Sequence, residues 1–239
     1  MIEVLPDPDA LAAGAARHIA AVAEQSVAAR GRFVVALAGG STPRATYGRL
    51  ATGPSGVRID WRRTHAFWSD ERCVPPDDPR SNYRMARETL LERVSIPAGQ
   101  VHRIQGEADP DTAATAYERV LRAQLDDGGL DLVLLGLGQD GHTASLFPGG
   151  AAVRERVRWV VATEHPDGDA IRRVTLTPVI INAARHVCFI VSGGGKAERL
   201  RDAIEGSSPP ERLPARAVRP RGGSLTWLVD APAASRLAV

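Results

Sequence analysis

The sequence contains little cysteine and almost no lysine. Its two cysteines, Cys73 and Cys188, lie far apart in the chain, and two are too few for a cysteine zinc site or a disulfide framework. Of the 30 basic residues, only Lys196 is a lysine, and all the others are arginines. Lysine carries a compact point charge, whereas arginine carries a wide planar fork. The lysine at position 196 is therefore either a product of chance or a sign of a specific chemical task.

Other features are missing as well. No run approaches the roughly eighteen consecutive apolar residues of a membrane span. The N-terminal residues Glu3, Asp7 and Asp9 are acidic, and a secretory signal peptide would need a basic start. We therefore expect a cytoplasmic protein that does not contact membranes. The net charge is +2 and the charged residues are interspersed, so no basic run indicates a nucleic-acid partner.

Short apolar runs alternate with segments of helical periodicity along the whole chain. The 239 residues are 44% hydrophobic, enough for a substantial core. We predict strands over residues 33–38, 65–69, 101–105, 130–135, 158–163, 173–177, 186–192 and 225–229, and helices over 8–30, 43–50, 82–93, 109–127, 178–185 and 196–204. This alternation predicts an α/β fold of three layers (α/β/α), with a Rossmann-like, mostly parallel sheet. No linker or repeat interrupts it, so we expect a single domain over residues 1–239.

The most informative stretch begins with the aliphatic run 130–135, which suits a parallel strand covered on both faces. The run breaks into three glycines over 136–141, and the break also holds Asp140 and His142. Open α/β sheets bind ligands at the carboxyl ends of their strands. An aspartate and a histidine at such a place can do acid–base chemistry.

Three further strand ends carry polar residues. The run 39–43 (GGSTP) joins a strand to a helix, and the free amides of a helix N-terminus bind anions. Ser41 and Thr42 could add hydroxyl donors there or could simply cap the helix. The charged residues 70–72 follow the next strand. They either lie at the same sheet edge as the loop 39–43 or form a solvated turn. Lys196 follows a glycine turn and could contact a phosphate as a point charge.

Four motifs stand in order along the chain: LAGGSTPR, SDER with SNYRM, GLGQDGHTASLFP, and RVTLTP followed by IVSGGGK. Together they resemble the 6-phosphogluconolactonase family, whose pattern GxGxDGHTASLFP is matched without a gap over residues 136–148. The resemblance covers the chain from Ala36 to about Leu200. It implies a hydrolase of the oxidative pentose phosphate pathway that converts 6-phosphoglucono-1,5-lactone to 6-phosphogluconate without a cofactor.

The resemblance also implies roles for individual residues. His142 would act as the general base on a water molecule, and Asp140 would orient either the imidazole or the substrate hydroxyls. Arg72 would stabilise charge on the carbonyl oxygen. Asp70 and Asn82 would line the substrate site. The expected phosphate contacts are Gly40, Ser41, Thr42 and Lys196, with Arg44 and Arg173 as further anion contacts that could equally be surface ion pairs.

No set of residues has the spacing of metal ligands, so we expect no metal. The expected partner is a small sugar-phosphate lactone, and the expected assembly is a monomer or a small homo-oligomer.

Three other functions deserve comparison. Residues 136–141 match the dinucleotide fingerprint G-x-G-x-x-G, but the chain then reaches Pro148 before a helix can form. The related glucosamine-6-phosphate deaminases carry a catalytic glutamate where this chain has Phe147, which cannot titrate. A sugar-phosphate sensor of a transcription regulator would need a DNA-binding module. The residues before the strand at 33–38 form only one alanine-rich helix without a basic face.

Overall fold

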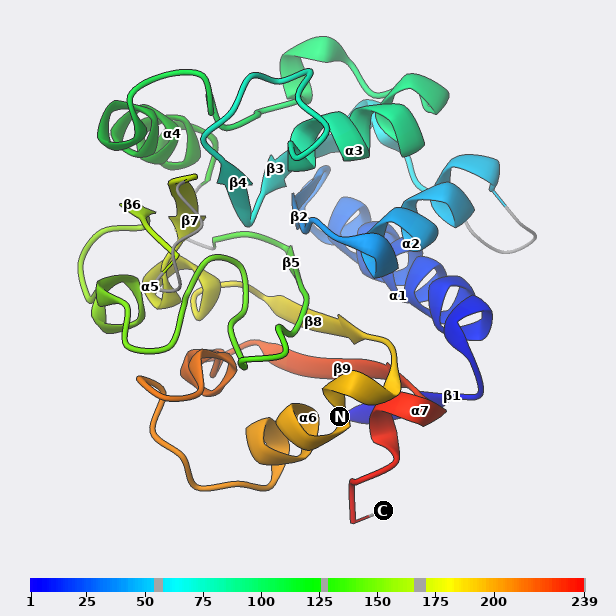
Figure 1. The fold of residues 1–239 in the computed structure, drawn as a ribbon. Helices are drawn as coiled ribbons and strands as arrows, with labels where there is room; N and C mark the ends of the chain where they lie inside the picture. Colours follow the sequence, from blue (N-terminus) through cyan, green and yellow to red (C-terminus); the bar gives the residue numbers. More distant parts are fainter. Residues whose placement is uncertain (54–57, 126–128, 166–170, 239) are drawn as a thin grey trace.

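A parallel sheet of six strands forms the centre of the computed structural model, which describes residues 1–53, 58–125, 129–165 and 171–238 (Figure 1). The strand order is β1-β9-β8-β5-β2-β3, and every neighbouring pair is parallel. The strands are β1 (Ile2–Leu5), β2 (Phe33–Leu37), β3 (Thr64–Trp68), β5 (Leu132–Leu135), β8 (His186–Val191) and β9 (Ser224–Asp230). The predicted α/β fold with a mostly parallel sheet is confirmed.

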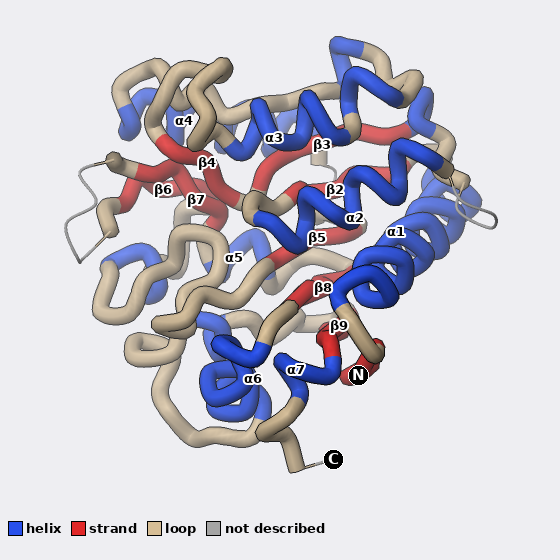
Figure 2. Tube along the Cα trace, turned by 45° about the vertical axis from the view of Figure 1, so that its right-hand side comes forward, coloured by secondary structure: helices blue, strands red, loops and turns tan. Residues whose placement is uncertain are grey.

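Helices cover both faces of this sheet. Helices α1 and α2 lie on one side of the strands, and α4 and α5 lie on the other (Figure 2). The long helix α1 begins where the Asp7 side chain accepts a hydrogen bond from the Ala10 N–H, and it ends at Gly31 in the left-handed conformation. The helices are α1 (Pro8–Arg30), α2 (Ser41–Thr52), α3 (Asn82–Thr89), α4 (Pro110–Gln124), α5 (Pro178–Ile181), α6 (Ala197–Ile204) and α7 (Ala231–Ala234).

A second, smaller sheet corrects the prediction of one sheet. Strands β4 (Asp70–Arg72), β7 (Arg173–Leu176) and β6 (Val160–Thr163) pair in that order and are antiparallel. From the sequence alone, residues 70–72 are expected at the sheet edge or in a solvated turn, not in a strand of their own. The chain changes sheets at Ser69, whose N–H donates to Leu37 of β2 while its carbonyl accepts from Leu176 of β7. After that residue the backbone pairs with β7 rather than β2, so the charged segment is a strand.

Other elements differ from the prediction as well. Strand β1 (Ile2–Leu5) was not expected; it lies at the sheet edge, is mostly exposed and pairs only with β9. The strand predicted over 101–105 reduces to a single bridge between Val101 and Ala66. The helix predicted over 178–185 ends at Ile181. Each of these segments is short, and a few residues carry too little periodicity to identify an element.

A buried carboxylate joins three elements at the edge of the sheet where the strands begin, opposite their carboxyl ends. Asp131 precedes β5 and is 3% exposed. Its Oδ2 accepts a hydrogen bond from the Val34 N–H of β2 at 2.8 Å, and its Oδ1 accepts one from Arg30 Nε of α1 at 2.9 Å. The charge of Asp131 therefore holds the end of α1 against the start of β2 and β5.

We predict that Asp131→Asn lowers the free energy of unfolding by about 1.5–3 kcal/mol, the usual size of a hydrogen bond to a charged group. Asparagine keeps the shape but removes the charge and one acceptor. Urea denaturation measures the change. The matched control is Asp9→Asn, because the Asp9 side chain is 88% exposed and its loss should change stability by no more than about 0.5 kcal/mol. Equal effects of the two substitutions would contradict this role for Asp131.

Candidate active site

A cleft of about 220 Å³ lies at the carboxyl ends of strands β2, β3, β5 and β8. Residues from four separate segments meet there, as expected where parallel strands end side by side. The cleft is lined by Ala38, Gly39, Gly40, Ser69, Asp70, Arg72, Asn82, Gly136, Leu137, Gly138, His142, Ala144 and Lys196.

The loop after β5 holds a histidine–aspartate pair. The Nδ1 atom of His142 lies 2.6 Å from Oδ1 of Asp140, and the His142 N–H donates to the same oxygen at 3.1 Å. The Gly138 N–H closes the loop on the His142 carbonyl at 2.8 Å. Gly138 is necessary for this geometry, because a Cβ atom at that position would lie 2.1 Å from Nδ1 of His142.

The pair has a defined electrostatic state. Burial pushes the pKa of Asp140 upward, but hydrogen bonds from the His142 ring and backbone outweigh it and hold that pKa at about 2. Asp140 is therefore ionised, and the Nδ1 atom that faces it carries a proton. The second ring nitrogen, Nε2, is then the acceptor when the ring is neutral. One third of the His142 side chain is exposed, so the imidazole is accessible from the cleft.

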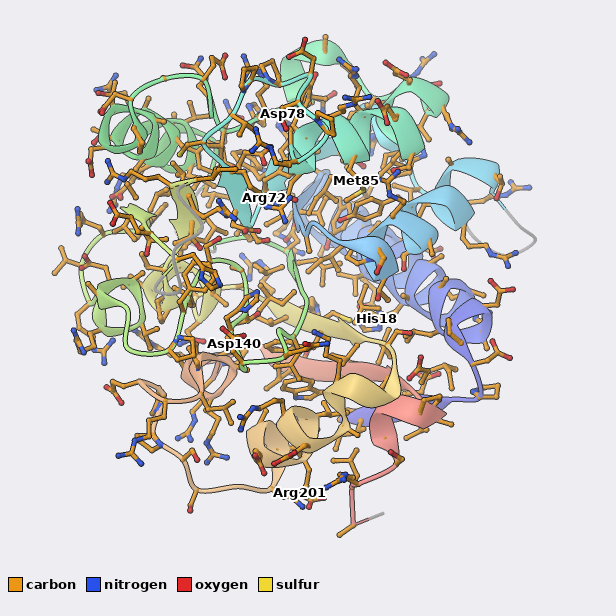
Figure 3. The ribbon with its side chains drawn as sticks, in the orientation of Figure 1. His18, Arg72, Asp78, Met85, Asp140 and Arg201 are labelled. Atoms are coloured by element: carbon orange, nitrogen blue, oxygen red, sulfur yellow. The ribbon has the colours of Figure 1, made fainter. Side chains whose placement is uncertain are left out.

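Strand β4 supplies a second acid and a cation to the cleft. Asp70 is 9% exposed, and its Oδ2 accepts a hydrogen bond from the Ser145 hydroxyl at 2.7 Å. Arg72 donates through Nη1 to the carbonyl of Arg80. Figure 3 shows Arg72 at β4 and Asp140 on the loop that follows β5 (Figure 3). Strand β4 and the loop after β5 thus bring the Arg72 guanidinium and the His142 imidazole, which is bound to Asp140, to one cleft.

Gly40 and Lys196 also line the cleft and form the part of it that can bind an anion. Gly40 precedes α2, whose N-terminus has no side-chain cap, so its first amides remain available to an anion. Burial lowers the pKa of Lys196, and the charge of Asp140 opposes this shift. Lys196 ends a short 3₁₀ helix, η5 (Gly194–Lys196), that follows β8.

Several predicted site residues do not line this cleft, and Asp140 is one of them, although it contacts His142, which does. Ser41 and Thr42 form the first turn of α2, without capping it, and Arg44 is exposed on the same helix. Arg173 is buried in β7, where its guanidinium donates to the carbonyl of Ile171.

Sequence reasoning also missed residues that line or support the cleft. Ser69, Leu137 and Ala144 line it, and Ala144 has a left-handed φ of 47°, which is uncommon outside glycine. Ser145 supports it through its bond to Asp70. All four residues lie within the motifs SDER and GLGQDGHTASLFP, and Ser145 carries the clearest signal, because its hydroxyl is a natural partner for a carboxylate.

The described ranges contain neither a cluster of metal ligands nor a membrane-spanning helix. No three His, Cys, Asp or Glu side chains in them gather closely enough to hold a metal ion. None of the helices in these ranges has the length and apolar character needed to cross a membrane.

The chain matches the family model of glucosamine-6-phosphate isomerases and 6-phosphogluconolactonases over residues 6–227. It belongs to this family. A 6-phosphogluconolactonase of Mycobacterium tuberculosis is 40% identical over 245 residues, which cover 99% of this chain and 98% of the relative. One from a Nostoc species is 39% identical over 244 residues, covering 100% and 98%. The solved structure of the Trypanosoma brucei 6-phosphogluconolactonase superimposes with a TM-score of 0.88 at 33% identity, covering 100% of this chain and 98% of that one.

We predict that Gly138→Ala breaks the hydrogen bond between His142 and Asp140 while the protein stays folded. The added methyl group requires the two side chains to move apart, since both lie within 2.5 Å of its position. Nitrogen-15 NMR of the imidazole should show a protonated Nδ1 in the wild-type protein and a mixture of tautomers in the variant.

The matched control is Gly48→Ala on α2, where a Cβ atom would meet nothing within 4 Å. It should leave the His142 signals unchanged. A fixed Nδ1–H tautomer that persists in Gly138→Ala would show that Asp140 does not set the state of the ring.

Proposed function

We propose that this protein hydrolyses 6-phosphoglucono-1,5-lactone to 6-phosphogluconate in the oxidative pentose phosphate pathway. The family and the full-length relatives named 6-phosphogluconolactonase support this reaction. The observation that carries the mechanism is the hydrogen-bonded pair of His142 and Asp140, in which His142 lines the same cleft as Lys196. A general base and a cation for the phosphate are the two groups that this reaction needs.

His142 is the general base of the mechanism. With Nδ1–H bound to Asp140, Nε2 accepts a proton from water while the water oxygen attacks the C1 carbonyl. The tetrahedral intermediate then collapses, and the bond between C1 and the ring oxygen breaks. The imidazolium returns its proton to the departing C5 oxygen, so the products are a hydroxyl group and the C1 carboxylic acid, which ionises. The Asp140 carboxylate stabilises the imidazolium between these steps.

Two residues of β4 act on the substrate around C1. Arg72 stabilises the negative charge that develops on the carbonyl oxygen, since preorganised donors in a cleft contribute strongly to the transition state. Asp70 accepts hydrogen bonds from the sugar hydroxyls, and Ser145 holds its carboxylate in place. Asn82 donates to the Asp70 carbonyl at 3.0 Å and lines the cleft beside it.

The phosphate group binds at the opposite end, between the α2 N-terminus and Lys196. Gly40 lets the phosphate approach the backbone closely, and the first amides of α2 donate to its oxygens. Lys196 adds a charge-assisted contact. Ser41 and Thr42 contribute through their backbone amides in this proposal, since their side chains do not line the cleft.

The main alternative is deamination of glucosamine 6-phosphate by the isomerase branch of the same family. Phe147 stands where the deaminases carry their catalytic glutamate. It is 3% exposed, and its ring centroid lies 5.1 Å from that of His142. An apolar ring in contact with the imidazole provides no acid or base at that place, which favours the lactonase. A cytoplasmic location, the oligomeric state and the absence of nucleic-acid partners remain predictions of the sequence.

We predict that His142→Asn lowers kcat for lactone hydrolysis by about 10²–10⁴-fold, the usual contribution of a positioned general base. Asparagine keeps a similar size and hydrogen bonding but accepts no proton. The rate is measured with purified protein and corrected for spontaneous opening of the lactone. The variant should still bind 6-phosphogluconate, because its phosphate contacts lie on other loops.

The control is His186→Asn. His186 is the first residue of β8, at the opposite end of that strand from the cleft, and it bonds to the Ser224 hydroxyl. It should keep the wild-type rate. Wild-type hydrolysis no faster than the spontaneous reaction would contradict the proposed function. So would sustained release of ammonia from glucosamine 6-phosphate that is lost in His142→Asn.

A further inference from the structure

A second pocket, of about 260 Å³, lies between α5, the 3₁₀ helix η4 (Ala151–Arg154) and the 3₁₀ helix η6 (Pro214–Ala217). Four arginines line it, and we call it the arginine pocket: Arg156, Arg216, Arg219 and Arg221. It shares no lining residue with the active-site cleft. We propose that the arginine pocket binds a small phosphorylated molecule, independently of the proposed lactone hydrolysis.

The pocket has an excess of positive charge. Within the described part of the chain, none of the four arginines forms an ion pair with a carboxylate. Glu155 is the acidic residue in the lining. Its Oε1 accepts hydrogen bonds from the backbone N–H groups of residues 156–158, and its Oε2 accepts one from Arg158 Nε at 2.9 Å. Glu155 is thus already bound by other donors. The lining carries four guanidinium groups and a single carboxylate, so its net charge is positive.

One of these arginines is held in place by the neighbouring helix. Arg216 donates through Nη1 to the carbonyls of Asp202 and Ala203, at 3.2 and 3.3 Å, near the end of α6. A cation is favourable at that end of a helix. The Nε atom of the same side chain is buried and has no hydrogen-bond partner. A buried donor without a partner costs stability, and an anion in the adjacent pocket would offer this donor an acceptor.

The segment that carries Arg219 and Arg221 is fixed by Asn182. The Asn182 side chain donates to the Ala217 carbonyl at 2.8 Å and accepts from the Arg219 N–H at 2.6 Å. Its backbone carbonyl accepts from the Arg221 N–H at 2.9 Å. The backbone of this segment is therefore preorganised, whereas the Arg219 and Arg221 side chains are exposed. Preorganisation lowers the entropic cost of binding.

The composition of the pocket indicates its ligand. Guanidinium groups bind phosphate oxygens through two parallel hydrogen bonds, which makes arginine the preferred residue for such groups. The rest of the wall is partly apolar, with Val153, Pro178 and Val179. The volume of about 260 Å³ is slightly below the roughly 300 Å³ of the smallest usual ligand pockets, which restricts the ligand to a small molecule. These features fit a small metabolite with one or more phosphate groups attached to a less polar body.

Calorimetric titration with pyrophosphate tests the assignment. We compare the wild-type protein with Arg219→Gln/Arg221→Gln and with Arg212→Gln, which removes an exposed arginine of the same segment that does not line the pocket. The double variant should bind at least about tenfold more weakly, because it removes two guanidinium groups that donate charge-assisted hydrogen bonds to the phosphate oxygens. Arg212→Gln should bind as the wild-type protein does. Any pyrophosphate bound in the active-site cleft is common to all three proteins and cancels in the comparison.

The proposal is overturned if the wild-type protein does not bind pyrophosphate at millimolar concentration, if all three proteins bind it equally, or if both variants lose affinity equally. A duplex DNA oligonucleotide that binds through Arg219 and Arg221 while pyrophosphate does not would also overturn it. Thermal denaturation confirms that the variants are folded. Lactone hydrolysis is measured separately, so failure of this site leaves the proposed function intact.

Discussion

Parallel pairing of β3, β2, β5 and β8 is the constraint on which the site depends. Their register places Leu37 of β2 beside Trp68 of β3, and Leu135 of β5 beside Phe189 of β8. Because the four strands run in one direction, the chain leaves all of them at the same edge of the sheet. The loops that follow therefore bring Gly40, His142 and Lys196 to one cleft, although these residues are far apart in sequence.

A buried carboxylate completes the site where the chain leaves the main sheet. Glu71 of β4 accepts hydrogen bonds from the Ser81 hydroxyl and from the N–H groups of Arg72, Asn82 and Tyr83, at 2.7 to 2.9 Å. Burial raises the pKa of Glu71, and these hydrogen bonds oppose the shift. Glu71 thus ties β4 to the start of α3, and so fixes the backbone of two residues that line the cleft. Asn82 in turn packs against Gly39, where no Cβ would fit, since it would lie 1.9 Å from the Asn82 amide oxygen.

The sequence predicts the layers of the fold and the loops of the cleft because both follow from strong local patterns. The positions of the loop at Gly136 and of Lys196 at the cleft could be predicted, because parallel strands end at the same edge of the sheet. The small sheet could not be predicted, because β4 has three residues and its partner β7 lies about a hundred residues later. Its pairing is decided by tertiary contacts. For the same reason, the sequence could not predict that Glu71 holds the start of α3. That role depends on four hydrogen-bond donors that only folding brings to its carboxylate.

The central claim of this account is the orientation of the substrate between Lys196 and His142. A crystal structure of the protein with 6-phosphogluconate tests it most directly. The account predicts the phosphate group at Gly40 and Lys196, and the C1 carboxylate beside Arg72 and within hydrogen-bond distance of His142 Nε2. A phosphate group bound against His142, with the carboxylate at the α2 N-terminus, would contradict it.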